Sequence, residues 1–215
     1  MKNRMRIAFV VLTLSLSALA LQLTPDARIS QASDGRVEQN SYFNDAFEIS
    51  FRARAGWTIA LTPKGTVQFS PESSADDPVN RCSRALFSSE PAAVKKRQFG
   101  PKVTYFLFDP ECFPGAPFPK STKDAKAVGA FALRIINALA STPFNPPGGA
   151  DFSGYDAGKR MFVTLAVQQN IDKVHVNIML TLTESNNYWV VMTEMLDDEA
   201  KKAMGTGWAD MNVRP

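Results

Sequence analysis

Few side chains in this chain of 215 residues could carry catalytic or metal chemistry. It has two cysteines, Cys82 and Cys112, and one histidine, His175. The cysteines lack the C-x-x-C spacing of redox and metal motifs, and His175 is distant from both in sequence. A reactive or metal-binding thiol site would need all three residues brought together. In an oxidising compartment, an even number of cysteines instead predicts a structural Cys82–Cys112 disulfide.

His175 is a weak candidate for a catalytic base. A histidine base needs a nucleophile within reach and an acid to orient its ring. The sequence contains no G-x-S-x-G nucleophile motif. A zinc site would need further His or Cys ligands, which the chain cannot supply without breaking the disulfide. We expect His175 to lie on the polar face of an alternating strand over 174–182.

Carboxylates cluster at three places, and oxygen-rich clusters can bind calcium. They are Asp76-Asp77, Asp109 with Glu111, and Asp197 to Glu199. None has the regular spacing of a calcium-binding loop. The first two are expected to be solvated loop charges, and the third is typical of a helix start. The sequence therefore predicts no metal and no cofactor.

Two groups of side chains are candidates for partner binding. The first is the basic cluster Lys95, Lys96 and Arg97, which could contact an acidic partner or a lipid headgroup. The second is the aromatic pair Phe113 and Phe118. If these rings are exposed, they form an apolar patch suited to binding. The alternative is that they are buried against Tyr105 or Phe131.

The first twenty residues have the pattern of a secretory signal. Lys2, Arg4 and Arg6 precede an apolar run over 7–20 that closes with Ala-Leu-Ala. The run is shorter than the roughly 20 apolar residues that span a membrane. We expect cleavage near Ala20 and a periplasmic or secreted protein. The alternative is an uncleaved signal that acts as an anchor.

Removal of this signal leaves a chain close to neutral. Three of the 24 basic residues lie in it and none of the 21 acidic ones, so 21 of each remain. The near-balance argues against a nucleic-acid partner. Residues 21–40 are mostly small and polar and predict a flexible leader. The hydrophobic content of the whole chain is 45%, which is enough for a core. Residues 41–215 are therefore predicted to form a single globular domain.

The elements that must position these residues follow from the apolar periodicity. Alternating or apolar runs predict strands over 47–52, 57–61, 66–70, 83–88 and 102–108. Residues 109–119 contain four prolines, which cannot serve in a central strand, and predict a loop. The disulfide would tie this loop to the start of the 83–88 strand.

The second half begins with the clearest helix. Ser121 or Thr122 can cap it and Asp124 suits its first turn. Its apolar residues recur at three- and four-residue steps up to Leu139, so one face must lie on a sheet. Residues 143–158 are rich in Gly and Pro and predict a long loop. Strands over 161–169, 174–183 and 188–195, joined by short turns, predict an antiparallel meander, followed by a helix over 197–204 with Trp208 near it. The class is α+β: an antiparallel sheet with one long helix packed on it and a short C-terminal helix.

The segment S-Y-F-N-D-A-F-E-I-S-F-R-A-R-A-G-W, over 41–57, resembles the opening strand pair of the PsbP-like α/β/α sandwich domains. Those domains open with Tyr, Asn, a Phe-containing strand and Pro-x-Gly-Trp. The matching residues here are Tyr42, Asn44, Phe47, Ile49, Gly56 and Trp57, while Arg54 stands where the family has proline. The resemblance implies an exported domain that serves as an accessory or binding module and that shares no catalytic residues.

The sequence favours an exported, non-catalytic domain of the bacterial cell envelope or extracellular space that binds a protein partner. One alternative is a carrier in which the sheet and the 143–158 loop enclose an apolar ligand. Another is a hydrolase with an unrecognised site.

Overall fold

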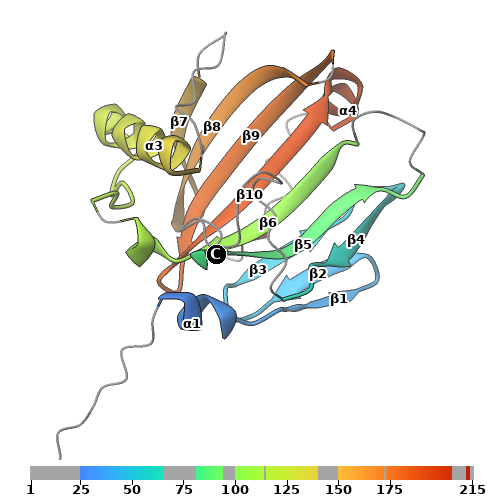
Figure 1. Cartoon of the computed structure of the whole chain (residues 1–215), viewed down its shortest axis with the longest axis horizontal. Helices are drawn as coiled ribbons and strands as arrows, with labels where there is room; N and C mark the ends of the chain where they lie inside the picture. The colour runs from blue at the N-terminus through green and yellow to red at the C-terminus, as the bar shows by residue number, and fades with distance from the viewer. Residues whose placement is uncertain are drawn as a thin grey trace, which may run out of the picture.

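The computed structural model describes residues 25–64, 81–93, 100–113, 115–139, 150–171, 173–204 and 212–213. Its centre is a seven-stranded antiparallel sheet in the order β4-β5-β6-β10-β9-β8-β7 (Figure 1). The strands are β4 (Trp57–Leu61), β5 (Ser83–Pro91), β6 (Lys102–Phe108), β7 (Ala150–Ala157), β8 (Arg160–Ile171), β9 (Val174–Ser185) and β10 (Tyr188–Asp197).

The strands β8, β9 and β10 form a meander in which a tight turn joins β9 to β10. Asn186 and Asn187 join β9 to β10 with φ values of 48° and 63°. Asparagine tolerates this left-handed region better than most residues, and such turns match the twist of paired strands. The register pairs Ser185 with Tyr188 and runs to Val176 opposite Asp197. The predicted meander is confirmed.

The long helix α3 (Ala125–Leu139) covers one face of this sheet (Figure 1). Its buried side chains Val128, Phe131 and Ile135 belong to one core cluster with strand residues such as Trp189 and Leu182. The N-terminal cap is Asp124, since its Oδ1 accepts the Ala127 amide at 2.9 Å. The predicted caps Ser121 and Thr122 lie in the preceding turn, where Ser121 Oγ accepts the Lys123 amide at 3.2 Å.

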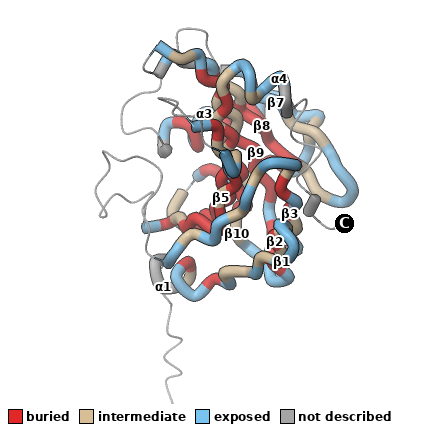
Figure 2. The backbone as a smooth tube through the Cα atoms, turned by 90° about the vertical axis from the view of Figure 1, so that its right-hand side faces the viewer, coloured by how far each residue is buried: buried red, intermediate tan, exposed pale blue. Residues whose placement is uncertain are grey.

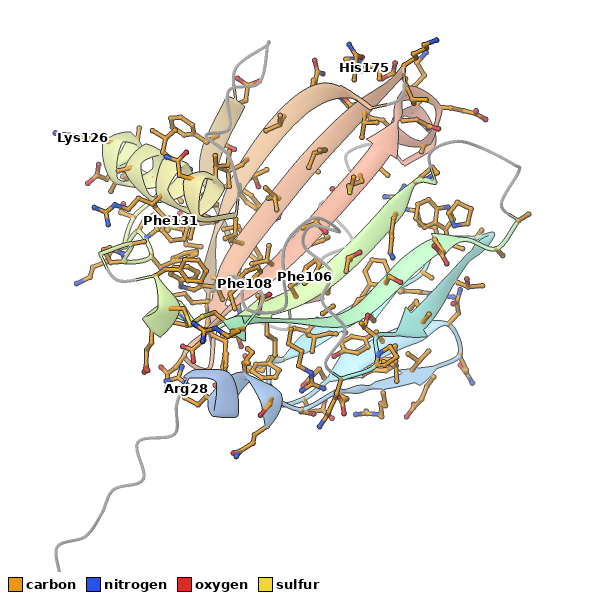
Figure 3. All side chains as sticks on the ribbon, in the orientation of Figure 1. Arg28, Phe106, Phe108, Lys126, Phe131 and His175 are labelled. Atoms are coloured by element: carbon orange, nitrogen blue, oxygen red, sulfur yellow. A yellow bond between two sulfur atoms is a disulfide. The ribbon has the colours of Figure 1, made fainter. Side chains whose placement is uncertain are left out.

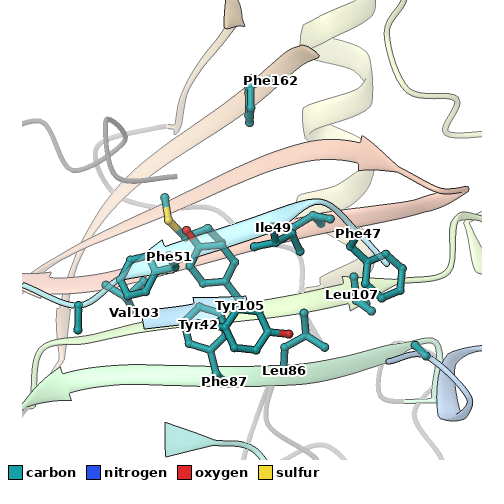
Figure 4. Packing of buried hydrophobic residues seen from close by; sticks show 14 of the residues in the cluster. Tyr42, Phe47, Ile49, Phe51, Leu86, Phe87, Val103, Tyr105, Leu107 and Phe162 are labelled. Carbon is teal, nitrogen blue, oxygen red and sulfur yellow. The ribbon is translucent and has the colours of Figure 1, made fainter. Parts of the chain in front are cut away.

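The opposite face is covered by a second, smaller sheet in the order β1-β2-β3-β11. Its strands are β1 (Arg36–Glu38), β2 (Ser41–Asn44), β3 (Ile49–Arg52) and β11 (Asn212–Val213). Tyr42 and Phe51 pack on Phe87, with ring centroids 4.1 and 5.4 Å away (Figure 4). Figure 4 shows the Tyr105 ring in the same cluster.

Helix α4 (Asp198–Met204) closes the same face at the far end of β9 and β10. Ala200 packs against the core there, and Lys201 Nζ donates to Asn177 Oδ1 at 2.8 Å. The sheet thus has α3 on one side, and α4 with the small sheet on the other. The predicted α+β class, with one long helix and a short C-terminal helix, is confirmed.

The expected flexible leader needs correction over residues 25–40. This segment forms α1 (Pro25–Ser30) and β1, which lie at the lower end of the molecule in Figure 2. Ile29 and Ala32 are buried in the core. Backbone carbonyl groups of this segment also accept hydrogen bonds from the rest of the fold. Arg84 donates to the Ala32 carbonyl, and Asn44 donates to Ser33 O at 3.0 Å. Residues 21–24 lie outside the described part.

Tyr42 completes this attachment. Its hydroxyl donates to the Asp34 carbonyl at 2.9 Å and accepts from Asn44 Nδ2 at 2.9 Å. Burial raises the pKa of Tyr42 to about 12, so the hydroxyl stays protonated as a donor. Gly35 is required beside it, because its φ is +72° and an added Cβ would lie 2.5 Å from the Tyr42 hydroxyl.

The predicted loop over 143–158 is wrong for residues 150–157, which form the edge strand β7. Gly154 reads as a turn residue in the sequence, but in the structure it allows the helix to approach. A Cβ at Gly154 would lie 3.1 Å from Val128 Cγ2 of α3. A glycine in a strand often marks such a close approach. The predicted strand over 66–70, residues 143–149, Trp208 and the cluster Lys95, Lys96 and Arg97 lie outside the described residues.

Replacement of Ile29 by Asp tests whether the N-terminal segment is part of the folded domain. Ile29 is 5% exposed, and burying a carboxylate there removes about 2 kcal/mol or more of unfolding free energy. Gln31→Asp is the matched control, since Gln31 is exposed on the same segment. Urea unfolding with the disulfide intact measures both. Equal midpoints for the two variants would show that the segment does not pack on the domain.

Candidate functional site

The proline-rich loop over 109–120 lies between β6 and α3. It belongs to neither the sheet nor the helix, so no regular backbone hydrogen bonding holds it. A disulfide joins Cys112 in this loop to Cys82 before β5, with Cα atoms 6.0 Å apart. The Asp109 amide donates to Cys82 O at 2.9 Å. A short 3-10 turn, η1 (Pro110–Cys112), begins at Asp109, whose Oδ1 accepts the Glu111 amide at 3.1 Å. The predicted disulfide is confirmed as a contact that anchors the loop.

Arg28 from α1 fastens the loop from its other side. Its guanidinium pairs with Asp109 Oδ1 at 2.8 Å and also contacts Glu111 Oε1. It lies over the Tyr188 ring, 5.2 Å from the centroid, and Tyr188 donates to Arg28 O at 3.2 Å. Figure 3 shows Arg28 at α1. The segment expected to be a flexible leader therefore holds the loop in position.

Asp109 is fully buried in this arrangement. Burial raises the pKa of its carboxyl group, while the Glu111 amide and the Arg28 guanidinium act in the opposite direction. Its second oxygen, Oδ2, has no hydrogen-bond partner within the described chain. Asp109 and Glu111, considered in the sequence as a calcium pair, are instead used as the partners of Arg28.

An open groove of 1220 Å³ lies between this loop and the ends of β8, β9 and β10. Its apolar lining is formed by Phe113 and Phe118 from the loop, Met161 from β8 and Trp189 from β10. Phe113 packs on Trp189 with centroids 5.4 Å apart, and Phe118 meets Phe131 of α3 edge-on at 5.0 Å. Figure 3 shows Phe131 between the helix and the sheet, where it supports this lining from behind.

Charged residues form the rim of the groove. Arg160 is held by Glu48 and by the Glu184 carbonyl, and Glu111 is held by Arg28. Lys120 and Lys159 are exposed and make no ion pair among the residues that the structure describes. The charged lining residues are therefore three cations, Lys120, Lys159 and Arg160, and three carboxylates, Glu48, Glu111 and Glu184.

The structure brings Phe113 and Phe118 together in this groove, and both are half-buried. Phe118 packs on Phe131 as considered in the sequence, but Tyr105 lies on the opposite face of the sheet. His175 is exposed at the other end of β9, far from Arg28 (Figure 3). Within the described ranges no three of the His, Cys, Asp or Glu side chains gather to hold a metal.

Sequence reasoning missed Met161, Trp189, Lys120 and Lys159. Met161 and Trp189 were assigned only to strands, and nothing local marks them as groove residues. Their positions at the ends of neighbouring strands, beside a disulfide-anchored loop, could have been found from the meander register. The two lysines are single charges that become neighbours of the apolar lining only through the β7–β8 turn and the loop.

No protein-family model and no curated protein matches this chain. Among solved structures, it is similar to cyanobacterial PsbP (CyanoP) from Synechocystis, with 11% identity, 86% of this chain and 99% of that chain covered, and a TM-score of 0.47. It is also similar to LpqN, described as involved in cell envelope biogenesis of Mycobacterium tuberculosis, with 14% identity, coverages of 74% and 82%, and a TM-score of 0.37. No helix among the described residues is long and apolar enough to cross a membrane.

Removal of the disulfide by Cys82→Ser with Cys112→Ser tests its role as the anchor. The bridge spans 30 positions, and its loss should lower the unfolding free energy by about 3–4 kcal/mol on the chain-entropy model. Limited proteolysis should then cut first within 109–120. If cleavage of the double variant begins elsewhere and this loop stays protected, other contacts hold the loop.

The buried carboxyl group of Asp109 predicts a defined pH dependence. Because its pKa is raised in the folded state, the folded protein binds more protons than the unfolded chain between the ordinary value and the raised one. The unfolding free energy contributed by Asp109 therefore falls as pH rises through that interval. The advantage of the wild type over Asp109→Asn, measured by urea unfolding at several pH values, should shrink with rising pH. An advantage that grows with pH would show that the attraction of Arg28 outweighs burial.

Proposed function

We propose that this chain is an exported, non-catalytic accessory domain that binds a protein partner in the cell envelope or outside the cell. The observation that carries the proposal is the open groove under the proline-rich loop, where aromatic side chains line a surface rimmed by charge. Apolar and aromatic residues inside a polar rim are the usual composition of a protein-binding surface. The secretory pattern of residues 1–20 supports the location, and Phe113 and Phe118 are proposed as contact residues.

The shape of the groove supports partner binding over the two alternatives. Pockets for small ligands usually measure about 300–1,000 Å³ and enclose most of the ligand. The groove is larger, at 1220 Å³, and open to solvent. A hydrolase would need a nucleophile and a base in one cleft, and His175 lies at the other end of the sheet. The cluster Lys95, Lys96 and Arg97 stays a proposed second contact, outside the described residues.

Site-directed photo-crosslinking in the producing cells tests this proposal. A photoreactive side chain at Lys120 or Lys159 should capture an envelope or secreted protein, because both positions border the groove. The same group at Lys126, which points away from the sheet on the outer side of α3 (Figure 3), is the control and should capture none. Equal capture from all three positions would contradict a binding site in the groove.

A substitution of an aromatic residue in the groove lining provides a second test of the proposed binding site. Phe118→Ser should abolish the cross-link from Lys120, because it removes a half-buried ring from the groove. Phe152→Ser is the matched control, since Phe152 is an exposed ring on β7 that lies outside the groove. Circular dichroism and the urea midpoint establish that both variants fold. Partner capture that survives in folded Phe118→Ser would overturn the proposed site.

A further inference from the structure

Arg28 of α1 bridges the two walls of the groove, and the inference drawn from it rests on the proposed function. One wall is the proline-rich loop, and the other is the end of the β9–β10 hairpin. On the loop side, the Arg28 guanidinium pairs with Asp109 and Glu111. On the hairpin side, it donates to the Asn187 carbonyl at 3.4 Å and lies over the Tyr188 ring. One side chain therefore connects both walls.

The hairpin and α1 are both attached to the packed core. The buried Ser185, at the end of β9, donates from its Oγ to the Phe47 carbonyl at 2.8 Å, which binds the hairpin to the connection between β2 and β3. The backbone of Arg28 is held by Tyr188, whose hydroxyl donates to the Arg28 carbonyl at 3.2 Å. The next residue, Ile29, is buried in the core. The loop is therefore the wall whose position Arg28 can set.

The contact between Arg28 and the loop also fixes the local fold of the loop. Asp109 Oδ1 accepts from Arg28 Nη2 at 2.8 Å and from the Glu111 amide at 3.1 Å, so one oxygen joins the guanidinium to the turn η1. The disulfide holds η1 at Cys112, and a covalent bond at one residue leaves the chain free to rotate about it. A guanidinium presents its donors in one rigid plane and can hold several acceptors in a set arrangement. Arg28 thereby restrains the rotation that the disulfide permits.

We propose that Arg28 is a positioning residue of the partner site and that α1 is a strap that sets the width of the groove. Arg28 acts through the two loop carboxylates, and so determines where Phe113 and Phe118 stand relative to the hairpin. With the strap in place, the walls keep the separation that the partner requires. Without it, the loop moves away from the hairpin and the partner binds more weakly, because the aromatic lining is no longer held in the binding arrangement.

The distance between the two walls, measured in the full exported protein, tests the proposal. Spin labels on unnatural side chains at Lys120 and Glu184, which are exposed and line opposite walls, leave the disulfide intact. Pulsed electron spin resonance should give one narrow distance distribution in the wild type. Arg28→Ala should broaden the distribution and shift it to longer distances. Arg28→Lys should restore it in part, because lysine keeps the charge but lacks the planar set of donors.

Arg36→Ala is the matched control. Arg36 is an exposed arginine of the same N-terminal segment, and its ion pairs are with Glu38 and Asp45 instead of the loop. The distance distribution in this variant should stay narrow. Partner capture by a photoreactive group at Lys159 should fall at least about fivefold in Arg28→Ala, as the loss of hydrogen bonds to charged groups allows, and should be unchanged in the control. Urea midpoints establish which variants are folded.

The outcomes separate the positioning role from the proposed function. A wider distribution with weaker capture in folded Arg28→Ala, both partly restored in Arg28→Lys, supports the proposal. An unchanged distribution, or unchanged capture despite a wider one, overturns it, while capture at the groove of the wild type still supports a partner site. If Arg28→Ala does not fold, Glu111→Gln removes an exposed ion pair of the same bridge and is judged by the same two measurements. Absence of capture in the wild type overturns the proposed function and, with it, the partner site that Arg28 would position.

Discussion

The attachment of the proline-rich loop is the constraint on which the candidate site depends. Residues 109–120 cannot join the sheet, because proline supplies no amide donor to a ladder. They are held instead by the Cys82–Cys112 disulfide, by the Asp109 amide on Cys82 O, and by Arg28 on the Asp109 carboxylate. These contacts come from two distant parts of the chain, around Cys82 and Arg28. The loop that they anchor places Phe113 on Trp189 and Phe118 against Phe131 of α3.

The two-sided burial of the sheet explains why the groove forms at this place. Helix α3 lies closest to β7 and β8, with Phe131 reaching Trp189 of β10, and the small sheet covers the other face beside β5 and β6. Where α3 begins, the loop that precedes it must cover the ends of β9 and β10 on the helix side. The loop buries Trp189 of β10 almost completely, and its own rings Phe113 and Phe118 stay half-buried at the groove.

Much of the fold could be predicted from periodicity, because the strands and α3 bury one or both faces in a regular way. The range 102–108 is the same in the prediction and in β6, and the disulfide followed from the cysteine count. Composition does not predict the folded segment 25–38, because single contacts attach it: the buried Ile29, the Arg28 ion pairs, and carbonyl groups bound by Arg84, Asn44 and Tyr42. Strand β7 is not predicted because a glycine in the sequence usually indicates a turn. In the structure, Gly154 instead lets α3 pack close to the strand. Phe113 and Phe118 were nominated from the sequence, but Trp189 and Lys159 join them only through the register of the meander.

The groove under the proline-rich loop is proposed as the surface that a partner covers. Hydrogen–deuterium exchange of the exported protein, alone and in its cross-link-purified complex, is the measurement to make. We expect slower exchange in the complex at the Phe118 and Lys120 amides and at the 159–161 turn, with little change on β7 and the small sheet. Protection confined to β7 or to β1–β2, with the loop amides exchanging as in the free protein, would contradict it.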